Sequence, residues 1–313
     1  MIMVMPENDH PTPCVATIGF FDGVHRGHAF LVNELLQLAR ERSMEATVIT
    51  FRDHPRRVLG ADFQPLLLTT NDEKRRMFVS LGIDRYVELP FDRAMAAMTA
   101  HDFMRDVLAT KLNVKVLLIG YDNRFGHNRD EGYDDYVGYG RELGIEVKQW
   151  QVMNVDGINV SSSVVRRLLA EGDVEKAALC LGYDYFLSGR VVHGVQIGRR
   201  IGHPTANITP VDPLKVVPAD GVYAVRVFIG GKWHNGVMNI GRRPTFGGGN
   251  LSMEVNIFDF EQDIYGQEIV IRFAKRLRSE RTFASAADLA RQIAIDKADA
   301  ARYFENYELR IKN

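Results

Sequence analysis

The sequence predicts an α/β Rossmann-like domain followed by a small antiparallel β-barrel with a C-terminal helix. Up to Gly182, short β-branched runs alternate with segments in which apolar residues recur every three or four positions, as on one face of a helix. This alternation is typical of a parallel sheet covered by helices on both faces. From Tyr185 the helical period fades, and closely spaced β-rich runs separated by Gly and Pro indicate a barrel. We therefore place a boundary near 183–185 and expect domains 1–184 and 185–313.

The bulk composition is that of an ordinary soluble globular protein. The chain has 313 residues, of which 46% are hydrophobic and 25% charged, and its formal net charge is −1. This length favours two domains, and the near-neutral charge offers no general attraction for nucleic acid or an anionic membrane. No apolar stretch approaches a membrane span, and residues 1–13 lack the features of a signal peptide. Cys14 and Cys180 lack metal-site spacing, so we expect free thiols, a cytoplasmic location and no nucleic-acid or membrane partner; the oligomeric state stays open.

The stretch 17–28, TIGFFDGVHRGH, is expected to form a strand end, a glycine-bearing turn and the start of a helix. It follows the apolar run 15–18 and leads into 29–40, where apolar positions have a helical period. Glycines let backbone approach a ligand closely, and a helix N-terminus offers unpaired N–H groups and the positive end of its dipole. His25 and His28 would share one face there and could donate hydrogen bonds to a phosphoryl group. The alternative is a pair of solvated histidines at the end of a loop.

The elements that follow continue the α/β pattern. The run 46–51 suits a buried strand, and Thr70 with Glu73 forms a capping box before a helix that extends through Leu81. The remaining expected elements are strands at 86–89 and 114–119, a helix from Thr99 to Leu112, and helices beginning near Ser161 and Asp173. Loops 52–55 and 120–126 leave the carboxyl ends of strands, where open α/β sheets bind ligands.

These segments resemble the HxGH nucleotidyltransferases, in the form carried by bacterial FMN adenylyltransferases. The resemblance rests on GFFDGVHRGH at 19–28, TFxxHP at 50–55, the loop 120–126 and VSSSVVR at 160–166. It implies that His25, His28 and Arg166 are catalytic, and a guanidinium suits a departing pyrophosphate. It also implies nucleotide contacts by Gly19, Phe20, Asp22, Gly23, Asp122, Ser161, Ser162 and Ser163.

Some of these residues also have simpler interpretations. Three hydroxyls at a helix start most often only cap the helix. The loop around Asp122 also fits a polar turn that ends a strand, and His54 fits an ordinary loop histidine. Asn123 stands where the family more usually has Phe, so the packing of that loop is expected to differ.

The second half has the pattern expected of a barrel. Gly230 and Gly231 form a two-residue hairpin signal, and Ser285 would cap a closing helix that runs to Phe304. The expected strands are 186–192, 221–229, 233–240, 252–258 and 269–273.

The stretch 189–207 resembles the riboflavin kinase signature nearly end to end. Its PTAN run implies that Thr205 and Asn207 are ligands of the Mg²⁺ that bridges the phosphates of ATP, and hydroxyl and amide oxygens suit this hard ion. The glycines imply a flap whose N–H groups meet phosphate, although hairpin turns alone would explain some of them. The implied nucleotide or flavin contacts are Gly194, Gly198, Arg199, Gly202 and Pro204, while His203 replaces a usual Phe.

Glu254 lies in the alternating run 253–258 and is the candidate base of the second site. A lone carboxylate on a strand usually faces solvent. The run, however, resembles the kinase strand whose Glu takes the proton of the riboflavin 5′-hydroxyl as it attacks ATP. The segment 277–283 resembles the loop that closes over the flavin, which implies binding by Arg278 and Glu280, with Thr282 in place of a usual Lys.

From Thr12 to the C-terminus the chain thus resembles the bifunctional riboflavin kinase/FMN adenylyltransferases, or FAD synthetases. The resemblance implies an enzyme that uses ATP and Mg²⁺, with riboflavin, FMN and FAD as substrates and products. One alternative is a nucleotidyltransferase for another phosphate ester, which the fused PTAN barrel argues against. Another is a flavin-binding regulator with an inactive barrel, which intact Thr205, Asn207 and Glu254 argue against.

Overall fold

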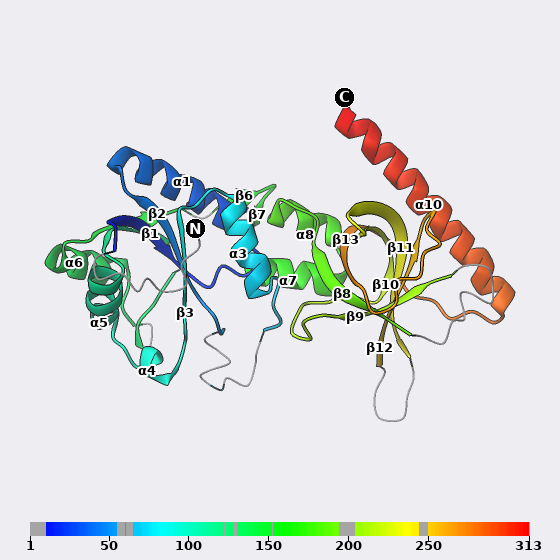
Figure 1. Cartoon of the computed structure of the whole chain (residues 1–313), viewed down its shortest axis with the longest axis horizontal. Coiled ribbons are helices and arrows are strands. Elements are labelled where there is room, and N and C mark those ends of the chain that lie inside the picture. Colours follow the sequence, from blue (N-terminus) through cyan, green and yellow to red (C-terminus); the bar gives the residue numbers. More distant parts are fainter. Residues whose placement is uncertain are drawn as a thin grey trace. The chain divides into compact units, whose positions relative to one another are not determined.

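A computed structural model of the chain describes residues 11–54, 60, 65–121, 123–127, 130–151, 153–193, 204–243 and 250–312. Its internal contacts divide the chain into two compact units, Met1–Ser162 and Ser163–Asn313. Figure 1 labels the helices and strands of both units.

The first unit is built on a five-stranded parallel sheet in the order β3-β2-β1-β4-β5. The strands are β1 (Cys14–Ile18), β2 (Glu45–Phe51), β3 (Arg85–Leu89), β4 (Val114–Gly120) and β5 (Glu146–Trp150). This confirms the predicted Rossmann-like class. The chain winds outward from β1 to β3 and then returns to the other side of β1 with β4, so the strand order reverses between β1 and β4. Ligands of such sheets bind beyond the carboxyl ends of the strands at this point.

Helices cover both faces of this sheet (Figure 1). On one face, α1 (Arg26–Arg42) and α3 (Asn71–Ser80) bury Leu35 and Phe78 against β-strand residues such as Val48. The opposite face packs against α5 (Ala100–Asp102), η1 (Phe103–Lys111) and α6 (Tyr133–Leu143). The remaining elements are the short helix α4 (Arg93–Ala96) and a hairpin of β6 (Asn154–Val155) and β7 (Ile158–Asn159).

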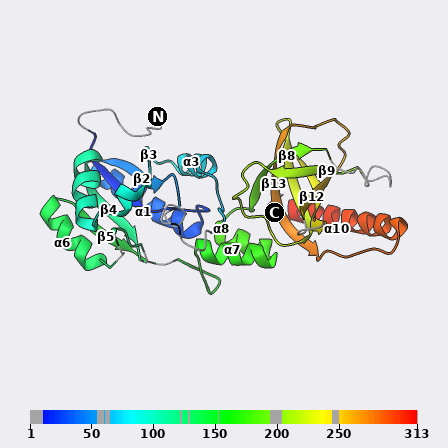
Figure 2. The same cartoon turned by 90° about the horizontal axis from the view of Figure 1, so that it is seen from below.

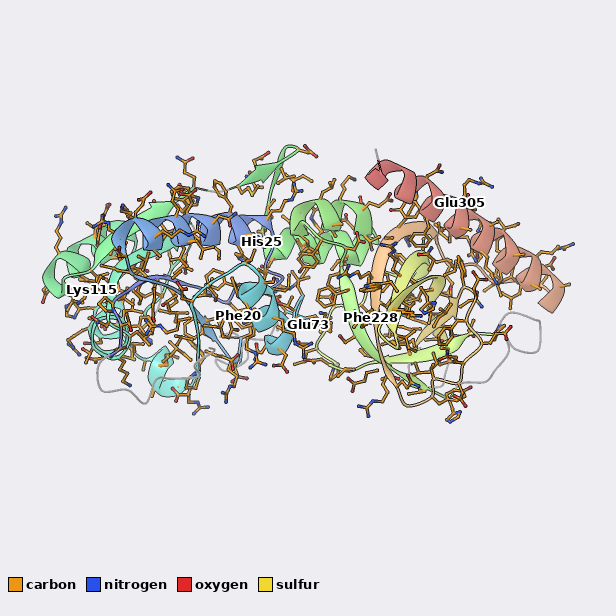
Figure 3. The ribbon with its side chains drawn as sticks, turned by 45° about the horizontal axis from the view of Figure 1, so that its top comes forward. Phe20, His25, Glu73, Lys115, Phe228 and Glu305 are labelled. Atoms are coloured by element: carbon orange, nitrogen blue, oxygen red, sulfur yellow. The ribbon has the colours of Figure 1, made fainter. Side chains whose placement is uncertain are left out.

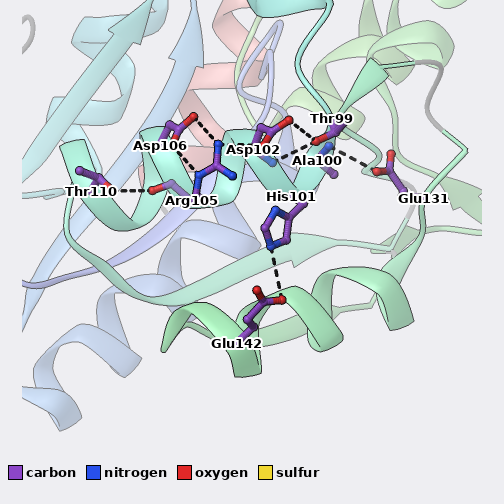
Figure 4. A network of polar contacts seen from close by, with 9 residues as sticks. All are labelled: Thr99, Ala100, His101, Asp102, Arg105, Asp106, Thr110, Glu131 and Glu142. Atoms are coloured by element: carbon purple, nitrogen blue, oxygen red, sulfur yellow. Dashed lines mark hydrogen bonds and ion pairs between the residues drawn. The ribbon is translucent and has the colours of Figure 1, made fainter.

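The helix expected from Thr99 to Leu112 is present, but most of it is wound more widely than an α-helix. Thr99 accepts a hydrogen bond from the backbone N–H of Asp102 at 3.1 Å and so caps its start. From Phe103 to Lys111 it is a π-helix, and Thr110 donates to the carbonyl of Arg105, five residues earlier, at 2.7 Å. Figure 4 shows the ion pairs around it, Arg105 with Asp102 (2.8 Å) and Asp106 (2.8 Å), and His101 with Glu142 (3.4 Å). Such exposed pairs stabilise little.

The second unit is a closed antiparallel barrel in the order β10-β11-β12-β9-β8-β13. Its strands are β8 (Phe186–Val192), β9 (Ala206–Pro210), β10 (Gly221–Ile229), β11 (Lys232–Arg243), β12 (Asn250–Ile257) and β13 (Glu268–Arg278). The C-terminal helix α10 (Ala286–Lys312, red in Figure 2) buries Ala300 and Phe304 against Val222 and Val237 of the barrel. The barrel and its closing helix therefore confirm the predicted class.

The barrel strands agree with the expected runs, with one addition. Gly230 and Gly231 have φ angles of 56° and 81°, the left-handed backbone that a two-residue hairpin between β10 and β11 requires. The additional strand is β9 (Ala206–Pro210), which the sequence did not predict because its first two residues end the PTAN motif, interpreted as a ligand-binding segment.

Two helices that precede the barrel belong to its compact unit. They are α7 (Ser162–Glu171) and α8 (Val174–Leu181). Arg276 of β13 donates to the backbone carbonyls of Glu171 (3.1 Å) and Asp220 (2.7 Å), so a barrel side chain caps the end of α7. The predicted boundary of the kinase domain, at 184/185, lies after both helices and stays a prediction.

Candidate active sites

The predicted HxGH turn joins β1 to α1 at the switch point of the sheet. Phe21, Gly23 and Val24 have φ angles of 54°, 80° and 35°, so three residues of this turn have left-handed backbone. His25 is the N-cap of α1, and its Nδ1 accepts a hydrogen bond from the backbone N–H of His28 at 3.3 Å. In the neutral imidazole the proton of His25 is therefore on Nε2, which becomes a hydrogen-bond donor.

The two histidines form one unit in this turn. Their rings are stacked, with centroids 3.5 Å apart, and Phe21 meets the ring of His28 edge-on at 5.1 Å. The Nδ1 of His28 is buried without a hydrogen-bond partner among the described residues. Burial lowers the pKa of His28 well below its usual value, and the nearby His25 and Lys74 lower it further. His28 is therefore neutral near pH 7, and its ring can donate a hydrogen bond without carrying a charge.

Asp22 links the turn to residues 68 and 69 through hydrogen bonds. Its buried carboxylate accepts hydrogen bonds from the backbone N–H groups of Leu68 (3.0 and 2.9 Å) and Thr69 (3.0 Å). Thr69 also accepts one from the N–H of Gly23 at 3.0 Å. These contacts give Asp22 a role in fixing the turn, beside the nucleotide contact that its motif implies.

The aromatic residues of the turn are packed against its backbone. The ring of Phe21 lies on Gly19, where an added Cβ would sit 3.0 Å from ring atoms and would force the ring to shift. The ring of Phe20 meets His54 edge-on at 4.6 Å, which places the predicted loop histidine next to the turn. Figure 3 labels Phe20 and Glu73 near helix α3, and His25 at the start of α1.

The other predicted residues of this site are only partly described. Ser162, the last residue of the first unit, donates to the backbone carbonyl of Asp22 at 2.8 Å. Ser163 and Arg166 lie farther along α7, in the second compact unit, and Ser161 directly precedes this helix. Asp122 lies outside the described residues. The Nδ2 of its neighbour Asn123 donates to the carbonyl of Ile18, so this departure from the family pattern fixes its loop to the end of β1.

In the barrel, the end of the PTAN run lies beside β12. Thr205 donates to Oε2 of Glu254 at 3.1 Å, and Asn207 pairs with Glu254 in the register of β9 and β12. Oε1 of Glu254 accepts a hydrogen bond from Ser252 at 3.3 Å. The hydroxyl, amide and carboxylate that the sequence singled out therefore lie together. Gly194, Gly198, Arg199, Gly202 and His203 lie outside the described residues.

Two cavities meet at Thr205. The first, of about 360 Å³, is lined by Pro204, Thr205, Ile257, Phe260 and Tyr265, among others. The second, of about 320 Å³, is lined by Thr205, Glu254, Asn256, Arg278, Glu280 and Phe283, among others. Thr205 therefore lines both cavities.

The predicted flavin loop is anchored to the barrel and to α10. Arg278 makes two hydrogen bonds to the carboxylate of Asp296 on α10, at 2.9 and 2.7 Å, and both side chains are largely buried. The carboxylate of Glu280 lies against Gly241, where an added Cβ would force that side chain to move. Thr282 is exposed. The loop and α10 therefore form one wall of the second cavity.

Sequence reasoning missed three residues of these sites. Asn256, 6% exposed, donates to the carbonyl of Pro204 at 2.7 Å, and its Oδ1 is buried without a partner among the described residues. Asp296 is buried in α10 as the partner of Arg278. Lys74 lies buried behind the HxGH turn. The first two sit on amphipathic elements, where a polar residue is normally solvent-facing, so only the tertiary structure identifies them.

Comparisons with known proteins match the two parts of the chain to two families. A family model described as FAD synthetase matches residues 7–164, and one described as riboflavin kinase matches residues 181–304. The bifunctional riboflavin kinase/FMN adenylyltransferases of Escherichia coli K12 and Bacillus subtilis are 40% and 38% identical to it, over 93% of each chain. A crystal structure of a Streptococcus pneumoniae protein named for macrolide efflux has the same fold, with a TM-score of 0.87, 30% identity and coverage of 96% of this chain and 98% of that one.

Proposed function

This chain belongs to the family of bifunctional riboflavin kinase/FMN adenylyltransferases, and we propose how its residues divide the two reactions. The barrel carries the riboflavin kinase, which converts riboflavin and ATP to FMN, and the Rossmann-like unit carries the FMN adenylyltransferase, which converts FMN and ATP to FAD and pyrophosphate. The observation that carries this conclusion is that the two family models fall on two different architectures.

For adenylyl transfer, we propose that His25, His28 and Arg166 stabilise charge on the reacting phosphates. A phosphate oxygen of FMN attacks the α-phosphorus of ATP, and the bond to the bridging oxygen breaks to release pyrophosphate. The nucleophile is already ionised, so the step needs positioning and charge stabilisation rather than a strong base. The hydrogen bond that leaves the proton of His25 on Nε2 supports a donor role for that ring. Gly19, Phe20, Asp22, Gly23, Asp122 and Ser161–Ser163 would bind the nucleotide, as their motifs imply.

For the kinase, we propose that Glu254 takes the proton of the riboflavin 5′-hydroxyl as that oxygen attacks the γ-phosphorus of ATP. The contact with Thr205 and the register with Asn207 support this assignment, because base and phosphate-binding residues must lie close together. Thr205 and Asn207 offer the hard oxygens that Mg²⁺ prefers, and they would hold this ion with the ATP phosphates, where it would offset their charge.

We assign the two cavities by what lines them. The second cavity is bounded by Phe283, Arg278 and Glu280 of the loop that resembles the flavin loop, so riboflavin would bind there. The first would take the nucleotide, because Pro204, Thr205 and Ala206 of the PTAN run line it. Gly194, Gly198, Arg199, Gly202 and Pro204 would line the nucleotide or flavin path. In this arrangement Thr205 lines both cavities, so the Mg²⁺ that it would hold would lie close to both ligands.

We also propose a cytoplasmic location and no nucleic-acid partner. Cys14 and Cys180 are buried and neither forms a disulfide, which fits a reducing compartment. In the described part of the chain, no helix has both the length and the apolar character needed to cross a bilayer.

The direct test is to incubate the purified chain with riboflavin, ATP and Mg²⁺ and to separate the flavins over time. FMN should appear first and FAD later, and omission of Mg²⁺ should suppress FMN formation. If FMN formed at the full rate in the presence of a chelator, the roles of Thr205 and Asn207 would be wrong.

Replacing Asn256 by leucine should lower the kinase rate about tenfold and raise the Mg²⁺ concentration needed for half-maximal rate, because one hydrogen bond to the PTAN loop is lost. Leucine has a similar size but cannot donate to the carbonyl of Pro204. FAD formation from added FMN is the internal control and should not change. An unaltered Mg²⁺ dependence would mean that Asn256 does not position the loop.

The domain boundary gives a further prediction. A fragment beginning near Asp184 should phosphorylate riboflavin, and one beginning at Ser163 should do so with a higher melting temperature. The longer fragment keeps α8, with Val174 and Cys180 buried, and keeps the Glu171 carbonyl that Arg276 binds. Circular dichroism melting and a kinase assay on both fragments provide the comparison. If the shorter fragment melts cooperatively but is inactive, the functional kinase domain must begin before α7.

A further inference from the structure

Lys74 of α3 is a buried lysine behind the HxGH turn. Its side chain is 1% exposed. Its Nζ donates to the carbonyl of Phe20 (3.0 Å), the hydroxyl of Thr50 (3.1 Å) and the carbonyl of Phe51 (3.4 Å), so each of its three N–H donors has an acceptor. Among the described residues, no carboxylate lies within ion-pair distance of this ammonium.

These acceptors lie at the carboxyl ends of β1 and β2. Phe20 follows β1, whereas Thr50 and Phe51 end β2, and the Thr50 hydroxyl also donates to the Phe20 carbonyl at 3.2 Å. Nζ lies 4.3 Å from the centroid of the Phe20 ring, in cation–π contact. A capping box of Thr70 and Glu73 fixes the start of α3, so the helix presents Lys74 in one position. One ammonium therefore joins α3, the end of β2 and the entry to the turn.

The charged form of Lys74 is energetically unfavourable in this position, because burial among neutral acceptors removes the ammonium from water. Burial lowers the pKa of Lys74 to about 8, although Asp22 and Glu88 partly oppose the shift. A neutral side chain could join the same loops without this cost. The neighbouring His28 is neutral near pH 7, so it provides no full positive charge at the turn, while Lys74 is mostly charged at that pH.

We propose that Lys74 is a positioning residue for adenylyl transfer, whose ammonium fixes the Phe20 turn and places a positive charge behind the phosphates that the turn binds. This inference rests on the assignment of the HxGH turn as the adenylyl-transfer site. Lys74 does not donate to the phosphates themselves, because its three donors are already used within the protein.

The role of the charge can be tested through pH. The titratable and charged groups around Lys74 are Asp22, His25 and His28 of the turn, and Glu88 of β3, which Arg52 pairs at 3.0 Å. A lysine with a pKa near 8 loses its charge as the pH rises through that value. The kcat/KM of FAD formation, which reports the free enzyme, should therefore fall between about pH 7 and 9.

Two variants separate the charge from the shape. Lys74→Met should lower kcat/KM for FAD formation on the order of 10–100-fold, the effect of one unit charge several ångströms from phosphates at intermediate dielectric, and it should remove the fall between pH 7 and 9. In Lys74→Arg the side chain stays charged at every pH in this range. The decrease in kcat/KM for FAD formation should therefore move to higher pH. Arg75→Met, at an exposed position on the same helix, is the matched control and should resemble the parent protein.

Riboflavin phosphorylation by the same samples, together with a melting curve, reports whether each variant is folded. An unchanged pH profile in both Lys74 variants, or a flat profile in the parent protein, would overturn the proposal. His28→Ala is measured in parallel. If it keeps the parental rate of FAD formation, the site assignment itself fails, whereas loss in His28→Ala with retention in Lys74→Met rejects only the role of Lys74.

Discussion

Replacing His28 by alanine should lower the rate of FAD formation from FMN and ATP by about 10²–10³-fold, the usual cost of losing one preorganised donor to developing charge. The ring sits in the first turn of α1, stacked on His25 at 3.5 Å, and its Nδ1 is buried without a protein partner among the described residues. Because its pKa is lowered, this ring donates as a neutral imidazole. The measurement is FAD production from supplied FMN, with saturating ATP.

The control for this variant lies in the same unit. His101→Ala removes a histidine that pairs with Glu142 at 3.4 Å on the surface, and it should leave FAD formation unchanged. Riboflavin phosphorylation should continue in both variants, because its proposed residues all lie in the barrel unit. A near-parental rate of FAD formation in His28→Ala would remove His28 from the catalytic residues.

The two folds could be predicted from the sequence because each depends on local periodicity. The helical and strand periods gave the parallel sheet, the barrel and α10, and the glycine pair 230–231 indicated its hairpin. Thr205, Asn207 and Glu254 were singled out through their motifs, and the pairing of β9 with β12 brings them together. A motif identifies residues that a reaction needs, so it can indicate a site even where the secondary-structure propensity of the segment is weak.

The rest depends on tertiary packing that no local pattern records. Lys74 follows a capping box on a polar helix segment, where a lysine is normally solvated, and it is buried only because α3 docks behind the turn. The π winding of 103–111 leaves the apolar positions close to a helical period, so the sequence predicted a helix without its type. Asn123 was recognised only as a departure, and its hydrogen bond to Ile18 became visible in the fold.

Replacing Glu254 by glutamine should lower the rate of riboflavin phosphorylation by about 10²–10⁴-fold, the usual contribution of a positioned general base. The carboxylate lies on β12, in contact with Thr205 at 3.1 Å and Ser252 at 3.3 Å. Glutamine keeps the length and planar end of the side chain but cannot take the proton of the 5′-hydroxyl. FMN formation from riboflavin, ATP and Mg²⁺ is measured, with FAD formation from added FMN as the internal control.

A matched variant in the same barrel is Glu268→Gln. Glu268 is an exposed carboxylate of β13 that pairs with Arg190, so its loss should leave both activities unchanged. The comparison separates the role of one carboxylate from a general loss of negative charge on the barrel.

The hydrogen bond to Thr205 also allows the role of Glu254 as general base to be distinguished from a purely structural role. The amide oxygen of glutamine can still accept the hydrogen bond from Thr205, so a residue that only orients the PTAN run would tolerate the change. Under that structural alternative, Glu254→Gln should keep its rate, while Glu254→Leu, which has no acceptor, should lose it. Under the proposed mechanism both variants lose the rate to a similar extent, because neither can accept the proton. Parental FMN formation by Glu254→Gln would therefore leave Glu254 as a support for Thr205 and require another base.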